Sequence, residues 1–290
     1  KGTEQFHTSY ALNEWDAKLA GTTPWKGKLD TQRGGILANE LKKQGWKISF
    51  YIPNFAPAID LLSQSNFTSV IMGPHSHVTE YFKKKFDVAI LDIQDTTESL
   101  IFSIQKCTRY IVSFEDLGAG RNHVDLLIDC NLAPSKIRNL PSSTRGLFGT
   151  DYSVLHPDFA YYHAESKNFG TCLQSVLISM GATDPKNMTL PLTNFILHEK
   201  HELKLTVLIG HNTKITHALN QLSRQFKLLD IRGPVSNMAQ MLWGHDVVIC
   251  SGGVTLHETI SVGTPAFVIN QVEHQQTKAR FVEKLGAAIN

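Results

Sequence analysis

A serine, two glycines, a threonine and a glutamate stand close together in Ser251–Glu258 (SGGVTLHE), directly after the apolar run Asp246–Cys250. The glycines let the backbone approach a ligand closely, and the following helix offers free N–H groups and the positive end of its dipole. Such a turn suits a phosphate or a diphosphate, and Thr255 adds a hydroxyl donor. The same letters also fit a structural turn, because Thr255 and Glu258 have the spacing of a capping box. The local pattern leaves both interpretations open.

A second loop repeats this design. The segment ISMGATDPKNMT (Ile178–Thr189) again passes from an apolar run through a glycine into a helical stretch. Ligands of parallel α/β sheets gather at the carboxyl ends of the strands, where helices begin. Two such loops in one domain therefore favour a nucleotide diphosphate as the ligand over two coincidental turns.

The elements that must position these loops alternate along most of the chain. Short apolar runs are separated by amphipathic stretches, a pattern typical of parallel sheets covered by helices. The pattern lapses in Leu155–Gly170 and then restarts, so the sequence predicts two Rossmann-like domains, residues 1–165 and 166–290. Helices are predicted at Gly34–Gln44 and Thr97–Cys107, and Ala20–Gly35 is interpreted as a long polar stretch. The predicted strands are Phe6–Leu12, Trp46–Ile52, Asp87–Asp92, Arg109–Phe114, Asp125–Cys130, Gln174–Ser179, Leu203–Ile209, Phe226–Ile231, Asp246–Cys250 and Pro265–Ile269.

Composition limits the possible partners. The 290 residues are 42% hydrophobic and 19% charged, and the net charge of +2 gives no reason to expect nucleic acid or an anionic membrane as the main partner. No apolar run reaches the roughly 18 residues of a membrane span, and the polar N-terminus is unlike a signal peptide.

Four cysteines without a Cys-x-x-Cys pair favour reduced core thiols and a cytoplasmic location. Because the chain begins at Lys1 and stops after an apparent helix, we expect its C-terminal domain to be truncated.

Longer motifs resemble those of a known family. ISMGATDPKNMT, RGPVSNMAQMLWGHDVVICSGGVTLHETISVGTPAFVI and EHQQTKA, with LANELKKQGWKISFYIP and VSFEDLGAGRNHVDLLIDCN before them, resemble the UDP-sugar hydrolases of pseudaminic acid biosynthesis and the related spore-coat polysaccharide proteins. More distantly, they resemble the glycosyltransferase that adds N-acetylglucosamine to lipid-linked peptidoglycan precursors. The resemblance implies the GT-B architecture, in which two Rossmann-like domains face each other across a cleft. It also implies hydrolysis at the anomeric carbon of a UDP-activated amino or deoxy sugar, releasing UDP, in bacterial surface-glycan or nonulosonic-acid biosynthesis.

The same resemblance assigns the ligand contacts. The turn at Ser251 would hold the diphosphate, Glu258 would accept hydrogen bonds from the ribose hydroxyls, and the backbone near Val235 would meet the uracil. No metal or other cofactor is required by this interpretation, and the expected partners are the UDP-sugar and a further enzyme of a glycan pathway. The implied substrate-binding residues are Arg33, Gly181, Asp184, Asn187, Val235, Met238, Ser251, Gly252, Gly253, Thr255, Glu258, His274 and Gln275.

The catalytic motif of that family is not intact here. In the family, the first βα loop carries Gly-x-Gly-His-x-x-Arg, and the His is proposed to activate water. Aligning LANELKK places Arg33 on the Arg of the motif and Asp30 on the His position. A carboxylate with an ordinary pKa of about 4 is a weak base at neutral pH. Asp30 is the candidate catalytic residue of a changed hydrolysis, and the alternatives are a glycosyltransferase with a remodelled acceptor loop or a binding protein without turnover.

Two other polar clusters are interpreted mainly as structural, although His75 in one of them, like His7, is a conceivable stand-in for the missing base. His75 and His77 lie two residues apart but have no third metal ligand close in sequence, so no metal site is expected there. Glu115 and Asp116 form a carboxylate pair at a strand end. Asp116 is interpreted as a turn residue that binds backbone N–H groups and helps to position the cleft.

Overall fold

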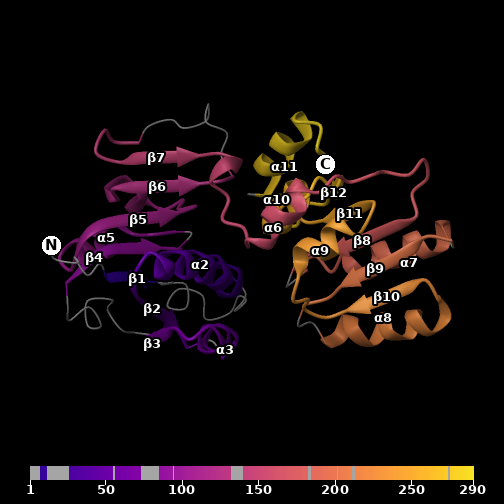
Figure 1. Ribbon diagram of the computed structural model, residues 1–290, viewed down its shortest axis with the longest axis horizontal. Coiled ribbons are helices and arrows are strands. Elements are labelled where there is room, and N and C mark those ends of the chain that lie inside the picture. The colour runs from indigo at the N-terminus through magenta and orange to yellow at the C-terminus, as the bar shows by residue number, and fades with distance from the viewer. Residues whose placement is uncertain are drawn as a thin grey trace. The chain divides into compact units, whose positions relative to one another are not determined.

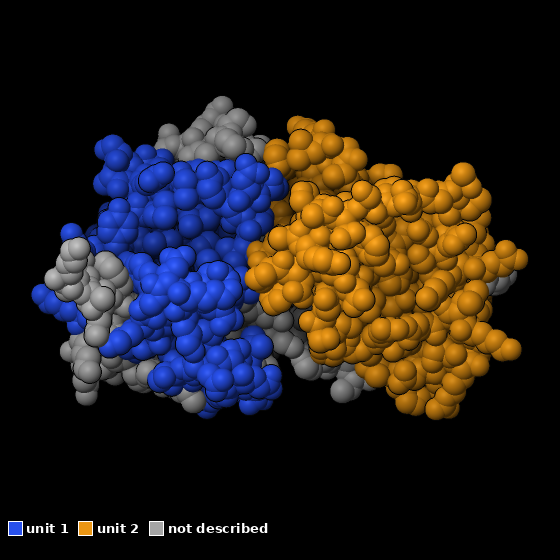
Figure 2. Space-filling view, in the orientation of Figure 1, with its two compact units in different colours: residues 1–154 blue, residues 155–290 orange. Residues whose placement is uncertain are grey.

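The computed structural model describes residues 7–11, 26–54, 56–72, 85–93, 95–131, 140–181, 184–200, 202–210, 213–273 and 275–290. The chain forms two compact α/β units, Lys1–Val154 and Leu155–Asn290 (Figures 1 and 2). Across these ranges, no helix is both long enough and apolar enough to cross a membrane.

The first unit contains a parallel sheet whose seven described strands follow the order β3-β2-β1-β4-β5-β6-β7. Its first six positions have the 3-2-1-4-5-6 order of dinucleotide-binding folds, and β7 adds one strand beyond them. The strands are β1 His7–Ala11, β2 Lys47–Pro53, β3 Thr68–Met72, β4 Phe86–Leu91, β5 Thr108–Phe114, β6 Leu126–Asp129 and β7 Arg145–Phe148. The helices are α2 Lys26–Lys43, α3 Ala56–Gln64 and α5 Glu98–Gln105, with the short 3-10 helices η1 Ala119–His123 and η3 Thr150–Tyr152.

Both faces of this sheet are buried, because successive residues of a strand point to opposite sides. In β2, Phe50 and Ile52 belong to the same core as Leu62 of α3, whereas Tyr51 belongs to a second core with Ile101 of α5. This two-sided burial explains why the strands have near-continuous apolar runs rather than an alternating pattern.

The second unit repeats the design with the strand order β10-β9-β8-β11-β12-β13, which is again 3-2-1-4-5-6. Val176 and Ile178 of β8 face one core and Leu177 faces the other. The strands are β8 Ser175–Ser179, β9 Lys204–Leu208, β10 Leu229–Arg232, β11 Val247–Cys250, β12 Ala266–Val268 and β13 Ala288–Ile289. The helices are α6 Asp158–Ala164, α7 Thr189–Glu199, α8 Thr213–Gln225, α9 Met238–Trp243, α10 Val254–Ser261 and α11 Gln275–Lys284.

The structure confirms the two Rossmann-like sheets and the predicted strands, and it adds three strands that the sequence did not predict. These are β3, β7 and β13, and each lies at an edge of its sheet. An edge strand has one neighbour and is less buried, so its sequence has less need of a long apolar run.

Helix α2 starts earlier than the sequence predicted. The interpretation of Ala20–Gly35 as a polar stretch outside the helix is wrong for its second part, because α2 starts at Lys26. A pair of glycines, Gly34–Gly35, is expected to interrupt a helix, since each costs about 1 kcal/mol relative to alanine. The helix nevertheless runs through the pair, with Ala38 fully buried in the core and Arg33 in an ion pair with Asp92.

The boundary between the units lies between Val154 and Leu155 rather than at residues 165 and 166. Helix α6 belongs to the second unit because Phe159, which is 4% exposed, packs in the same core as Leu242. In addition, the Nδ1 atom of His163 lies 2.7 Å from the carbonyl oxygen of Ser261. With seven residues and Phe159 as its one buried side chain, α6 is too short for a helical period to reveal it.

Candidate functional site

The carboxyl ends of β8 and β11 meet at the centre of the second sheet. β8 pairs with β9 on one side and with β11 on the other, so the direction of the connections reverses between β8 and β11. Ser179 is paired with Cys250, which places the segment after β8 beside the turn Ser251–Gly253. A Cβ atom on Gly181 would lie 3.6 Å from the Oγ atom of Ser251. Open α/β sheets bind their ligands at such a reversal point.

Helix α10 starts directly after this turn, and no described side chain caps it. Its N-cap residue is Gly253, with φ −84° and ψ −153°. Thr255 lies inside the helix, so the capping-box interpretation of Thr255 and Glu258 is wrong. First-turn N–H groups without a side-chain cap, together with the positive end of the helix dipole, form a position that favours an anion.

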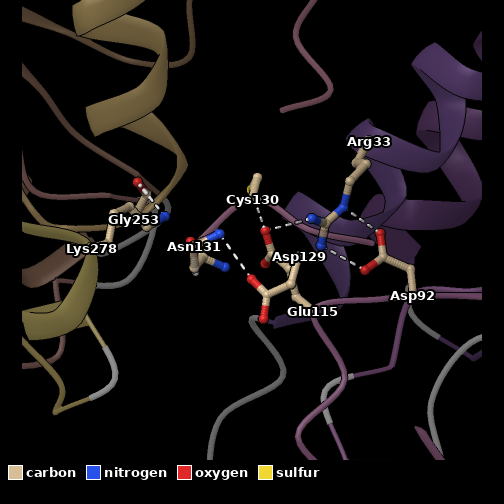
Figure 3. A network of polar contacts seen from close by, with 8 residues as sticks. All are labelled: Arg33, Asp92, Glu115, Asp129, Cys130, Asn131, Gly253 and Lys278. Atoms are coloured by element: carbon tan, nitrogen blue, oxygen red, sulfur yellow. Dashed lines mark hydrogen bonds and ion pairs between the residues drawn. The ribbon is translucent and has the colours of Figure 1, made fainter. Parts of the chain in front are cut away.

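The turn is packed tightly against the segment that links β12 to α11. A Cβ atom on Gly252 would lie 2.6 Å from Oδ1 of Asn270 and 2.9 Å from Cβ of Gln275, so glycine is required at this position. The ammonium group of Lys278 donates a hydrogen bond to the carbonyl oxygen of Gly253 at 3.1 Å (Figure 3). Lys278 is only 6% exposed, so a buried positive charge lies against the turn.

Glu258 is a partly buried carboxyl in the second turn of α10. Burial raises its pKa to about 7, while a hydrogen bond from Thr255 and the positive charge of Lys278 act in the opposite direction. Near neutral pH this carboxyl therefore exists in both protonation states. In its ionised form it can accept hydrogen bonds from two neighbouring hydroxyl groups, as a ribose diol would offer.

The segment between β8 and α7 contains three of the predicted contacts, and all three have left-handed backbone angles. The φ values are +83° at Gly181, +41° at Asp184 and +52° at Asn187. The buried carboxylate of Asp184 accepts the backbone N–H groups of Met188 and Thr189 at 2.8 Å each, so it holds the start of α7. The structure thus assigns Asp184 a role in shaping this segment, and its contact with a ligand stays a prediction.

The remaining predicted contacts of this unit are spread more widely. Gln275 is the first residue of α11, and its Nε2 atom would be 3.8 Å from a Cβ atom on Gly253, next to the glycine turn. Val235 and Met238 lie between β10 and the start of α9, and β9 separates β10 from β8 in the sheet. His274 lies outside the described residues.

In the first unit, Arg33 is held by carboxylates of the same unit (Figure 3). Its Nε and Nη2 atoms donate to the two carboxylate oxygens of Asp92 at 2.8 and 2.6 Å, and Nη1 lies 3.0 Å from Oε1 of Glu115. Burial raises the pKa of Asp92, and the charge and hydrogen bonds of Arg33 oppose that shift. Arg33 therefore has a structural partner, and its predicted contact with a substrate is untested.

Two carboxylates of the first unit were given roles from the sequence, and the structure describes only one of them fully. Asp116 accepts the backbone N–H groups of Thr96 at 3.1 Å and Gly118 at 2.9 Å, which confirms its interpretation as a turn residue. Asp30 lies in α2, but its side chain is outside the described part of the structure, as are His75 and His77. Among the described residues, no group of three or more His, Cys, Asp or Glu side chains is arranged to hold a metal ion.

Lys278 and Gln271 are residues of this site that the sequence did not predict. Gln271 is buried three residues beyond the end of β12 and hydrogen-bonds the backbone of Met180 and Lys186. Its place at the carboxyl end of a strand, the same criterion that singled out Ser251, is the signal that could have found it. For Lys278 no such signal exists, because lysine is normally exposed.

Solved structures match the chain over nearly its whole length. MurG of Acinetobacter baumannii matches with a TM-score of 0.62 and 17% identity, covering 98% of this chain and 85% of its own. The UDP-GlcNAc 2-epimerase from Neisseria meningitidis, solved with UDP-GlcNAc bound, matches with a TM-score of 0.58 and 12% identity, covering 98% of this chain and 95% of its own. The chain has the GT-B fold. This confirms the predicted fold class.

Two proteins match most of this chain, but the chain covers a smaller share of each of them. An uncharacterised protein of Methanocaldococcus jannaschii is 25% identical over 254 residues, which is 83% of this chain and 52% of that protein. Spore coat polysaccharide biosynthesis protein SpsG of Bacillus subtilis is 26% identical over 278 residues, which is 91% of this chain and 80% of SpsG. The chain thus spans about half the length of the archaeal relative. The predicted resemblance to spore-coat polysaccharide proteins is confirmed, and the finer assignment to the pseudaminic acid hydrolases stays a prediction.

The first part of the chain resembles a different protein. A family described as eukaryotic translation initiation factor 3 subunit 7 (eIF-3) matches residues 1–53. A component of eukaryotic translation initiation factor 3 from Drosophila yakuba is 56% identical over 48 residues, which is 17% of this chain and 9% of that protein. Asp30 and Arg33 lie within the segment 1–53, so their alignment to the hydrolase motif competes with this second resemblance. The catalytic role of Asp30 stays a prediction.

Proposed function

We propose that the second unit binds the UDP part of a UDP-activated sugar at the carboxyl ends of β8 and β11. The observation that carries this proposal is the turn Ser251–Gly253. It follows a central strand at the reversal point of the sheet and leads into α10, a helix without a described side-chain cap. Backbone N–H groups and the helix dipole favour the diphosphate there. The buried charge of Lys278 against the carbonyl of Gly253 adds to this preference.

The nucleoside would extend from this turn to neighbouring elements. Glu258 would accept hydrogen bonds from the ribose hydroxyls, and the segment from Val235 to Met238 would meet the uracil. The NH2 group of Gln275 is in place to donate to a phosphate or to the sugar. The UDP-GlcNAc bound in a structure of the same fold supports this choice of nucleotide.

The proposed reaction is hydrolysis at the anomeric carbon of a UDP-activated amino or deoxy sugar, releasing UDP, in bacterial surface-glycan biosynthesis. The similarity to SpsG supports the glycan setting. Water would attack the anomeric carbon while the bond to the diphosphate breaks, so that UDP leaves and the proton lost by water would pass to Asp30, the candidate base. The negative charge that develops on UDP would be stabilised by the N–H groups at the start of α10, which are already oriented toward it.

A second candidate is transfer of the sugar to an acceptor rather than to water. The match to MurG, at a TM-score of 0.62, favours this alternative among the enzymes of the same fold. Both reactions use the same nucleotide site and release UDP. They differ in the nucleophile, which the donor site alone does not select.

Calorimetric titration with UDP tests the binding proposal, with the exposed-surface variant Glu202→Gln as the matched control. We expect UDP to bind, and Gly252→Ala or Lys278→Met to weaken it while Glu202→Gln does not. Absence of UDP binding by the unmodified chain would refute the proposal. The reaction is then tested by measuring UDP release from a panel of UDP-amino sugars with and without added acceptors: release in water alone supports hydrolysis, and release only with an acceptor supports transfer.

A further inference from the structure

Gln271 is a buried amide whose two ends are both engaged. The side chain is 4% exposed. Its Nε2 atom donates to the carbonyl oxygen of Met180 at 2.7 Å, and its Oε1 atom accepts the backbone N–H of Lys186 at 3.0 Å. A single side chain, three residues beyond the end of β12, therefore joins Met180, directly after β8, to Lys186 further along the segment that leads to α7.

This segment needs such a connection. Asp184 and Asn187, two of its described residues, have left-handed backbone angles, which a non-glycine residue keeps only where its surroundings hold it. Asp184 holds the end of the segment that leads into α7. Gln271 holds Met180, next to β8, and Lys186, two residues after Asp184.

The backbone of Gln271 orients a second amide. Its N–H donates to Oε1 of Gln275 at 2.9 Å. An amide side chain carries its acceptor and its donors on opposite sides, so engaging Oε1 leaves the NH2 group of Gln275 on the other side. That side is where Gly253 lies, since a Cβ atom there would be 3.8 Å from Nε2. The NH2 group is thereby turned toward the glycine turn.

We propose that Gln271 is a positioning residue, which holds the β8–α7 segment and the NH2 group of Gln275 in the arrangement that receives the diphosphate. The inference rests on the proposed function, because it assigns the ligand to the same turn. Its physical basis is preorganisation: hydrogen bonds formed before binding reduce the ordering cost when the ligand arrives. The effect should fall on ligands that reach the turn, and not on those that contact only the nucleoside end.

The variant Gln271→Met tests this role, because methionine has a similar length and is apolar, and the backbone N–H to Gln275 is retained. The matched control is Thr206→Val, which removes the hydrogen bond between the buried Thr206 and Nε2 of His245, away from the loops. The dissociation constants of UDP and uridine are measured by calorimetry, together with Tm. We expect UDP to bind about tenfold more weakly to Gln271→Met, with uridine changed by less than about twofold, because the two lost hydrogen bonds hold backbone next to the glycine turn and not the nucleoside end. Thr206→Val should lower Tm and leave both constants unchanged.

Three results would count against the inference in distinct ways. Unchanged UDP affinity in Gln271→Met overturns the positioning role of the Gln271 side chain and leaves the proposed function standing. Equal weakening of UDP and uridine also overturns it, because a general structural role would act on both. If the unmodified chain binds no UDP, the proposed function fails. Amide hydrogen exchange then tests separately whether Gln271 holds the segment between β8 and α7. Exchange at Lys186 should be faster in Gln271→Met, and an unchanged rate would show that Gln271 does not hold this segment.

Discussion

Replacing Glu258 by glutamine is expected to stabilise the protein and to weaken UDP binding at the same pH. Burial raises the pKa of this carboxyl from an ordinary 4.5 to about 7. Since the folded-state pKa lies above that of the unfolded chain, the protonated side chain contributes stability that is complete below pH 4.5 and is lost as the pH rises through 7. Glutamine has the shape of the protonated form and keeps it at every pH.

The size of the stability effect follows from the shift. One pKa unit corresponds to about 1.4 kcal/mol, so holding the ionised Glu258 at pH 8 costs about 2–3 kcal/mol after allowance for solvent at a partly exposed side chain. We expect Glu258→Gln to raise Tm by several degrees at pH 8 and to leave it unchanged at pH 4.5. Differential scanning fluorimetry from pH 4.5 to 8.5 measures this difference.

The binding effect has the opposite sign. The proposed contact with the ribose uses the ionised carboxylate, and hydrogen bonds to a charged group contribute about 1.5–3 kcal/mol. Glu258→Gln should therefore lower the affinity for UDP about 10- to 100-fold at pH 8. For the unmodified chain, UDP affinity should rise from about pH 5.5 to 7 and then level off, because binding releases the proton of Glu258. Undiminished UDP binding by Glu258→Gln at pH 8 would refute the ribose contact, and the absence of a gain in Tm would refute the argument from burial. The exposed Glu202→Gln serves as the control in both assays and should change neither quantity.

Three further substitutions test other parts of the structure. Gly252→Ala should lower both Tm and UDP affinity, because the new Cβ atom would lie 2.6 Å from Oδ1 of Asn270. The control is Gly253→Ala, in which the atom nearest to the new Cβ is 3.5 Å away. Equal losses of Tm in the two variants would contradict the packing argument. Lys278→Met keeps the buried aliphatic part of the side chain and removes the charge. Calorimetry should therefore show UDP affinity about tenfold lower and a smaller change in uridine affinity. Equal losses of affinity for both ligands would assign Lys278 to folding alone. Arg33→Met should destabilise the first unit by about 3 kcal/mol in urea denaturation, because it leaves the buried Asp92 without its guanidinium partner. Adding Asp92→Asn should restore much of that loss, and a double variant as unstable as the sum of the single ones would show that the pair is not coupled.

The central strands could be predicted because burial on both faces demands a continuous apolar run. Val247–Cys250 is such a strand, and it lies between β8 and β12. The edge strand Ala288–Ile289 is two residues long, and its pairing with β12 depends on the fold already being formed. The same distinction explains the helices. Helix α2 crosses a glycine pair that local propensity would reject, and contacts distant in sequence stabilise it there.

The candidate site likewise contains residues that local sequence could predict and residues that only the folded structure brings together. Ser251–Gly253 and Gly181 could be predicted, because a glycine after an apolar strand is a local signal of close approach to a ligand. The roles of Gln271 and Lys278 depend on atoms of Met180, Lys186 and Gly253, which come together only when the strands of the second sheet are in register. A capping box at Thr255 was an equally valid interpretation of the letters. Only the position of the N-cap at Gly253 decides against it.

The two resemblances of the chain meet inside one sheet, and the packing there explains how this is possible. Residues 1–53, which match the initiation-factor family, contain β1, α2 and β2, and β1 pairs with both β2 and β4. Phe50 and Ile52 from this segment share a core with Ile90 and Phe114 from outside it. A parallel strand needs apolar side chains on both faces and free backbone groups at its edges, and neither requirement specifies a family. The fold can therefore be continuous where the two sequence resemblances overlap. The SpsG match covers 91% of the chain and so extends into residues 1–53. The alignment that places Asp30 lies in this overlap, so the case for function depends on the second unit and the loops after β8 and β11.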